Sequence, residues 1–229
     1  MRTTADQEML LRGGRAGQLA TFISLVMVFA GLIVSFTQYR VATFLLIGLG
    51  VVMYTVGSRS QEQAAREPWL IKQLTDALAE FDDRYHLYSH ALPAEHVLLT
   101  PHGVFALIVR GMDGKIRCFK DKWVRALTLR RALRFFTEES LGNPTKEVQR
   151  DVEKLAEYIQ ARAPGAQVDV QGVVVFANPA AQLEITSASF PVLPLTRLKS
   201  HIRKASGRME MAPETLRTLT DLFGERPPR

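Results

Sequence analysis

Two long apolar runs stand near the start of the chain. Residues 19–37 and 41–57 contain no charged side chain, and only three residues separate the runs. The first run is long enough to cross a bilayer core of about 30 Å at about 1.5 Å per residue. Its length, and the second run that follows at once, argue against a cleaved signal peptide. The pattern predicts a hairpin of two membrane-spanning helices over residues 17–58, with small residues that permit close helix packing at Ala20, Ser24, Gly31 and Ser35.

Basic residues flank this predicted hairpin on one side. Arg2, Arg12 and Arg15 precede it, Arg59 and Arg66 follow it, and Arg40 alone lies between the two runs. By the positive-inside rule, residues 1–16 form a cytoplasmic N-terminal segment, and the chain after the hairpin is cytoplasmic too. We therefore expect an integral membrane protein with two spans and both termini in the cytoplasm. Residues 59–66 are predicted to be a polar linker or a helical extension of the second span.

The rest of the chain mixes helical and strand-like patterns. Pro68 suits the first turn of a new helix, and apolar residues recur at helical spacing as far as Phe81. Asn143-Pro144 combines a helix N-cap with a proline at the first helical position, and shorter helices are predicted from Thr196 and from Pro213. These patterns predict helices packed against a sheet.

Strand patterns fill the intervals between these helices. They cover residues 84–89, 97–99, 104–109, 116–119, 168–176 and 183–186, while two prolines confine residues 190–195 to a sheet edge or a loop. Turn residues join the second, third and fourth of these segments, which predicts an antiparallel meander. The fold class is α/β: a two-helix transmembrane hairpin, then a mixed-sheet domain with flanking helices over residues 67–223, and a tail of residues 224–229.

Charge adds a candidate binding surface. The chain carries a formal charge of +6, which favours nucleic acid, anionic lipid or acidic partners. Between residues 115 and 134, eight basic residues face only one acidic residue. Three interpretations of this basic run stay open: a solvated face, a contact with anionic lipid, or a phosphate contact with nucleic acid. In the last of these, the nearby Phe119 or Trp123 could stack on the bases. Its members are Lys115, Arg117, Lys120, Lys122, Arg125, Arg130, Arg131 and Arg134.

The centre of the chain resembles the nuclease-related domain family, whose fold is similar to that of the PD-(D/E)xK, or restriction-endonuclease-like, nucleases. The segment from Pro101 to Phe105 matches the family's Pro-x-Gly-Val-Phe, and Trp123 stands at its later Trp. Ala94-Glu95-His96 stands where the family has Ile-Asp-His. Ile108-Val109-Arg110 stands where it has Glu-x-Lys. Glu67 matches the Glu of a Gly-Glu pair before the first helix of the family.

The resemblance implies a Mg²⁺ site at these positions, held by the family's Asp and Glu beside a Lys that activates water. Residues 108 and 110 share one face of a strand, but Ile108 offers no oxygen and Arg110 stays protonated. We therefore interpret Glu95 and Arg110 as a vestigial catalytic pair, with Glu67 and Glu95 as metal ligands only if the protein is active. A pairing of Arg110 with Glu95 or Glu67 is the structural alternative.

The remaining candidates are weaker. His86, His90, His96 and His102 match no compact zinc spacing, so we expect them at the surface or in turns. Cys118 is the only cysteine, which excludes an intrachain disulfide. The sequence predicts a membrane-anchored, non-catalytic protein that needs no cofactor and binds nucleic acid or a partner. The alternatives are a Mg²⁺-dependent DNA or RNA nuclease and a structural membrane protein with a lipid-binding basic face.

Overall fold

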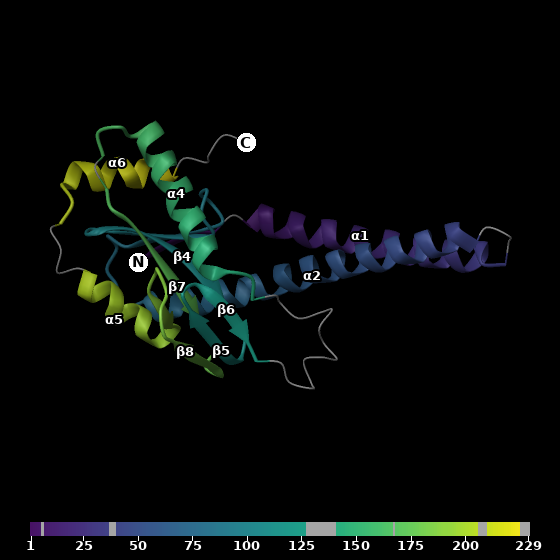
Figure 1. The fold of residues 1–229 in the computed structure, drawn as a ribbon. Coiled ribbons are helices and arrows are strands. Elements are labelled where there is room, and N and C mark those ends of the chain that lie inside the picture. The colour runs from purple at the N-terminus through teal and green to yellow at the C-terminus, as the bar shows by residue number, and fades with distance from the viewer. Residues whose placement is uncertain (6, 37–39, 127–140, 167, 206–209, 225–229) are drawn as a thin grey trace. The chain divides into compact units, whose positions relative to one another are not determined.

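A computed structural model describes the chain except for residues 6, 37–39, 127–140, 167, 206–209 and 225–229 (Figure 1). It contains two compact units. The described residues between 7 and 68 form a helical unit, and the described residues of 1–5, 69–126 and 141–224 form an α/β unit. Each is described by itself.

In the helical unit, α1 (Gln7–Val34) and the first part of α2 (Arg40–Leu78) pack along a seam of small residues. Gly17, Ser24 and Gly31 recur every seven residues on α1, and Thr43, Gly50 and Gly57 do so on α2. A Cβ added at Gly57 would lie 2.9 Å from the carbonyl oxygen of Gly17, so the backbones approach closely. The predicted hairpin of two long helices is confirmed.

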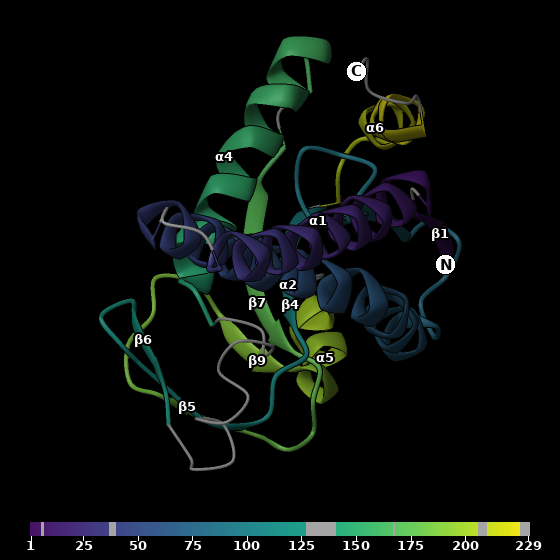
Figure 2. The same cartoon turned by 90° about the vertical axis from the view of Figure 1, so that its right-hand side faces the viewer.

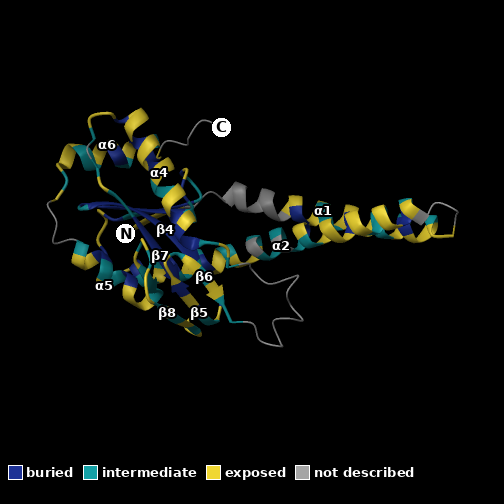
Figure 3. Ribbon diagram, in the orientation of Figure 1, coloured by how far each residue is buried: buried dark blue, intermediate teal, exposed yellow. Residues whose placement is uncertain are grey.

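The large apolar side chains of this hairpin point away from the seam. Phe22, Phe29 and Phe44 are 66%, 60% and 76% exposed, whereas the buried positions include Ser24 and Thr43. Figure 3 shows that exposed residues predominate along both helices of the hairpin. Both helices are long and apolar enough to cross a membrane by length and composition. A core helix of a water-soluble protein has the opposite arrangement, with its large apolar residues inside.

Helix α2 extends well beyond the second apolar run. Residues 59–66 are helical, so they form a helical extension of that run and not a polar linker. The predicted helix start at Pro68 is wrong, because α2 continues through this proline to Leu78. The missing N–H of Pro68 removes one hydrogen bond, but Leu70, Leu74 and Leu78 bury themselves in the α/β core and hold the helix beyond it.

A six-stranded sheet forms the centre of the α/β unit, in the order β1-β2-β3-β4-β7-β9. Its strands β4 and β7 are labelled in Figure 1. The strands are β1 (Arg2–Ala5), β2 (His86–Ser89), β3 (His96–Thr100), β4 (Gly103–Arg110), β7 (Val170–Phe176) and β9 (Val192–Pro194). β2, β3 and β4 pair antiparallel, and β1, β7 and β9 join parallel to their neighbours. The mixed sheet predicted from the sequence is confirmed.

Helices cover both faces of this sheet. The end of α2 and α5 (Leu195–Ala205) pack on one face through residues such as Leu74 and Leu198. On the other face, α4 (Pro144–Arg162) and α6 (Pro213–Gly224) contribute Leu155 and Leu219. The side chain of Asn143 accepts from the Lys146 N–H, which confirms the predicted N-cap of α4.

A second sheet of three strands corrects the predicted meander. β5 (Gly114–Phe119) pairs antiparallel with β6 (Lys122–Arg125) and parallel with β8 (Ala181–Ile185), and does not continue from β4 (Figure 2). β4 pairs with β7 instead, and the Ala177 N–H donates to the Arg110 carbonyl at the end of that ladder. The predicted turn between β3 and β4 is present at Pro101 and His102, whereas the turn predicted around Asp113 is not, because β5 already begins at Gly114. Turn residues also do not determine which long-range partner each strand takes.

The strand β1 was not predicted. Residues 1–16 were expected to be an N-terminal segment outside the domain, but Arg2–Ala5 forms the edge of the large sheet, paired with His86–Ser89. The chain therefore enters the α/β unit before α1 and re-enters it after α2. Leu127, Leu129, Leu133 and Phe136 interleave the basic run and suggest a short amphipathic helix. These residues lie outside the described part of the chain.

Candidate functional site

Arg110, the last residue of β4, is the centre of an ionic cluster. Its Nη1 lies 3.5 Å from Glu95 Oε2, and its Nη2 forms a close ion pair with Glu147 Oε2. The side chain is only 13% exposed, and those of Glu95 and Glu147 are 20% and 31% exposed. A guanidinium presents several donors in a fixed plane and can therefore join two carboxylates at once.

Ile108 lies two residues before Arg110, and both side chains face helix α4. It is 2% exposed, in an apolar cluster with Met112, Val148 and Phe176. Val148 and Glu147 both belong to α4, so this helix covers Ile108 with an apolar residue and Arg110 with an acidic one. The predicted common face of residues 108 and 110 is confirmed.

Asp151 follows Glu147 by one turn of α4 and contacts the backbone of Glu95. Its Oδ2 accepts the backbone N–H of Glu95 at 2.9 Å. Burial raises the pKa of the Asp151 carboxyl, and the hydrogen bond from Glu95 opposes this shift only in part. Neither Glu147 nor Asp151 was recognised from the sequence. Their spacing of four residues on the helix that begins at Pro144 places both on one face, and this was the signal available.

The neighbouring histidines correct another prediction. His96 is completely buried in β3, not at the surface or in a turn. Its Nδ1 lies 3.1 Å from Ser89 Oγ, its Nε2 lies 3.8 Å from Glu95 Oε1, and its ring packs edge-on against His90 with centroids 5.2 Å apart. Strand pairing explains the burial, because Ser89 and His96 lie directly opposite each other.

These residues do not fit the Mg²⁺ site that the family resemblance implies. A hard cation requires several oxygen ligands, and Ile108 contributes an apolar side chain instead. Arg110 already places a positive charge between Glu95 and Glu147. Glu67 belongs to the helical unit, on α2, and is therefore not assigned to this cluster.

The basic run is partly neutralised by acidic neighbours. Lys115 and Arg117 both form ion pairs with Glu184 of β8, and this holds the pKa of the Glu184 carboxyl below its usual range. Arg125 pairs with Asp113 at 2.7 Å. Lys120 and Lys122 form no ion pair with a described residue, and Lys120 Nζ lies 5.4 Å above the Phe119 ring. Arg130, Arg131 and Arg134 lie outside the described residues.

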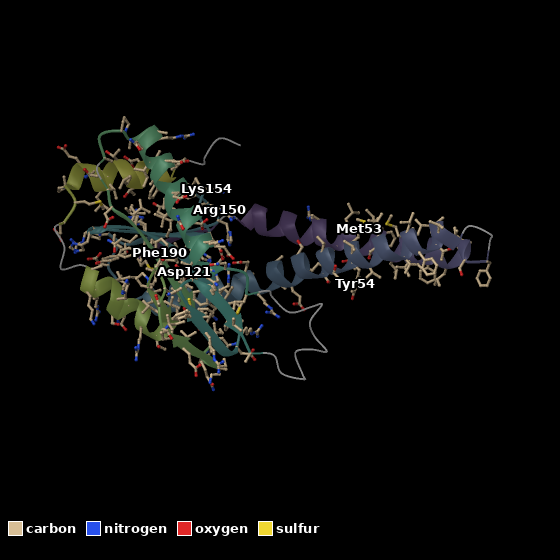
Figure 4. All side chains as sticks on the ribbon, viewed as in Figure 1. Met53, Tyr54, Asp121, Arg150, Lys154 and Phe190 are labelled. Atoms are coloured by element: carbon tan, nitrogen blue, oxygen red, sulfur yellow. The ribbon has the colours of Figure 1, made fainter. Side chains whose placement is uncertain are left out.

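Hydrogen bonds fix the β5–β6 hairpin in place. Lys120 and Asp121 occupy its turn with φ of 49° and 59°, the left-handed conformation that such two-residue turns require. Asp121 (labelled in Figure 4) accepts from the backbone N–H and the hydroxyl of Ser189, which lowers the pKa of the Asp121 carboxyl. The Trp123 indole N–H donates to Thr145 Oγ1 at 2.7 Å.

Comparison with known proteins agrees with the sequence resemblance. The model of the family described as "Nuclease-related domain" matches residues 63–177, which is just over half of the chain. No curated protein and no solved structure matched the chain. The matched segment includes β2 to β7 and the cluster around Arg110. On this match, the chain belongs to the nuclease-related domain family.

Proposed function

We propose that this chain is a membrane-anchored member of the nuclease-related domain family that does not cleave nucleic acid. It acts instead as a binding module for nucleic acid or a partner at the cytoplasmic face of a membrane. The observation that carries this proposal is the ion-pair cluster of Arg110 with Glu95 and Glu147.

The argument against catalysis is electrostatic. Arginine remains protonated at physiological pH, so Arg110 cannot take a proton from water. Its charge also opposes a divalent cation at the same carboxylates. At Ile108, a carboxylate would have to replace a side chain that is buried among apolar residues. These two positions supply neither the ligand nor the base that family-type cleavage requires.

Two features support the membrane anchor. The hairpin buries small and polar residues at its seam and exposes its large apolar residues, an arrangement suited to a lipid environment. The pairing of β1 with β2 gives an independent argument. These strands flank the hairpin in the sequence and lie in one sheet, so a chain that leaves the aqueous phase after β1 must return on the same side. Two spans satisfy this requirement.

The absence of cleavage is tested with the full-length protein in detergent. It is incubated with labelled single- and double-stranded DNA and RNA in the presence of Mg²⁺ or Mn²⁺, and we expect intact substrates. Metal-dependent cleavage that disappears in Glu95→Ala would overturn the proposal. Binding of the same nucleic acids is measured in parallel, and its decrease with rising salt would mark phosphate contacts.

The topology is tested with single cysteines in intact cells. Phe36→Cys, near the end of α1, should react with an impermeant reagent added outside, whereas Ser60→Cys should react only after the membrane is permeabilised. Labelling of Ser60→Cys in intact cells would contradict the proposed orientation.

The metal-dependent nuclease remains the second candidate, because Glu147 and Asp151 add two carboxylates beside Glu95. It requires these carboxylates to exchange the guanidinium of Arg110 for Mg²⁺. The cleavage assay above separates the two candidates.

A further inference from the structure

The outer face of the β5–β6 hairpin displays two apolar side chains. Phe119 and Val124 are 55% and 60% exposed. Among the described residues of the α/β unit, Trp69, at 44%, is the only other large apolar residue with comparable exposure. Arg117 faces Val124 and Phe119 faces Lys122 across the strand pair, so Phe119 and Val124 are diagonal neighbours on one face.

Lysines surround this apolar pair. Lys122 lies directly opposite Phe119, and Lys120 Nζ lies above the Phe119 ring. The outer face also carries Lys115 and Arg117, whose shared partner Glu184 offsets one of their two charges. Four basic residues against one acidic residue leave a formal charge of +3 on this face.

The hairpin holds these residues in a fixed arrangement. The inward side chains Ile116 and Cys118 are buried, and the turn is tied to Ser189 through Asp121. Trp123 is anchored to the first turn of α4 through Thr145. The exposure of Phe119 and Val124 therefore follows from the strand register, and both side chains remain in water unless something covers them.

From these features we infer that the outer face of β5 and β6 contacts an anionic lipid surface, with Phe119 and Val124 at the acyl boundary and Lys120 and Lys122 among the headgroups. This inference rests on the proposed membrane anchor, which keeps the chain at such a surface. A lipid surface matches the composition better than a nucleic acid does. Val124 has no aromatic face on which a base could stack, and Lys120 covers one face of the Phe119 ring. An aromatic and an aliphatic residue ringed by lysines suit a membrane interface.

The test uses the full-length protein reconstituted into vesicles, with Cys118→Ala to remove the native thiol. Val124→Cys carries an environment-sensitive fluorophore, and Gln160→Cys on the exposed side of α4 is the matched control. Vesicles contain phosphatidylcholine alone or with phosphatidylglycerol, and each type is made with and without acyl-chain spin labels. In anionic vesicles we expect a blue shift and spin-label quenching at position 124, and neither at position 160. In Lys120→Glu/Lys122→Glu the signal at position 124 should fall to its value in phosphatidylcholine.

The contrary results are equally specific. If the fluorophore at position 124 is as polar and as weakly quenched as that at position 160 in anionic vesicles, the inference is overturned. A spectral response to single-stranded oligonucleotides, with none to anionic lipid, would assign this face to nucleic acid instead. Vesicle flotation after alkaline extraction tests the anchor separately. If the protein stays with the vesicles while the fluorophore at position 124 remains exposed to water, the proposed anchor stands and only the inferred lipid contact is refuted.

Discussion

Replacement of Arg110 by methionine removes the central charge of the cluster and keeps most of the aliphatic stem. Breaking a buried ion pair costs about 3–5 kcal/mol, because the remaining charge is left without its partner. Glu95 and Glu147 retain 20% and 31% exposure, so water offsets part of this cost. We expect Arg110→Met to lower the free energy of unfolding by about 2 kcal/mol, which for a chain of this size lowers Tm by about 4–8 °C.

The assay is thermal unfolding of the full-length protein in nanodiscs, followed by near-ultraviolet circular dichroism. Arg84→Met is the matched control, because Arg84 also pairs with a carboxylate, that of Asp82, but is 59% exposed. Water screens a pair so exposed, so its loss should lower Tm much less than the loss of Arg110 does. Added Mn²⁺ should raise the Tm of Arg110→Met, since the freed carboxylates then favour binding of a cation. Equal Tm values for the two variants, with no response to Mn²⁺, would refute this reasoning.

Three further predictions concern other parts of the chain. Burial raises the folded-state pKa of Asp151, so the contribution of this carboxyl to stability is full below its unfolded pKa and is lost as the pH rises through the higher folded pKa. Asp151→Asn keeps an acceptor for the Glu95 N–H and should therefore reduce the fall of Tm with rising pH above about pH 4. In the hairpin, Gly57→Leu should weaken helix pairing by about 1–3 kcal/mol in a denaturant titration, while Gly48→Leu, where an added Cβ meets nothing, should not. Finally, the thiol of Cys118 is buried and its pKa is raised by that burial, so a thiol reagent should label it slowly in the native protein and rapidly in denaturant.

Local patterns predicted most of the elements but not their long-range partners. The apolar runs, the Asn143-Pro144 cap and the strand segments up to Phe176 carry their signal within a few residues, and each was recovered. The strand β1 was missed because Arg2–Ala5 is short and pairs with residues more than eighty positions away. β5 was assigned to the wrong sheet for the same reason, since a turn does not determine the partner of the strand that follows it.

The candidate site was also predicted only in part. The exchange of Glu-x-Lys for Ile108 and Arg110 is visible in the sequence, and so is Glu95 as one partner of Arg110. The second partner, Glu147, comes from a helix that follows β4 by more than thirty residues and approaches it only in the folded sheet. The burial of His96 likewise depends on the pairing of β3 with both neighbouring strands, which no local pattern encodes.

The guanidinium of Arg110 occupies the space between Glu95 and Glu147 in which a family-type site would hold a metal ion. Binding of Mn²⁺ by the full-length protein, measured by electron paramagnetic resonance, shows whether this space is open to a cation. We predict no bound Mn²⁺ in the unaltered protein and binding in Ile108→Glu/Arg110→Lys, provided that this variant folds as judged by circular dichroism. Binding of Mn²⁺ by the unaltered protein that is lost in Glu95→Ala would contradict the claim.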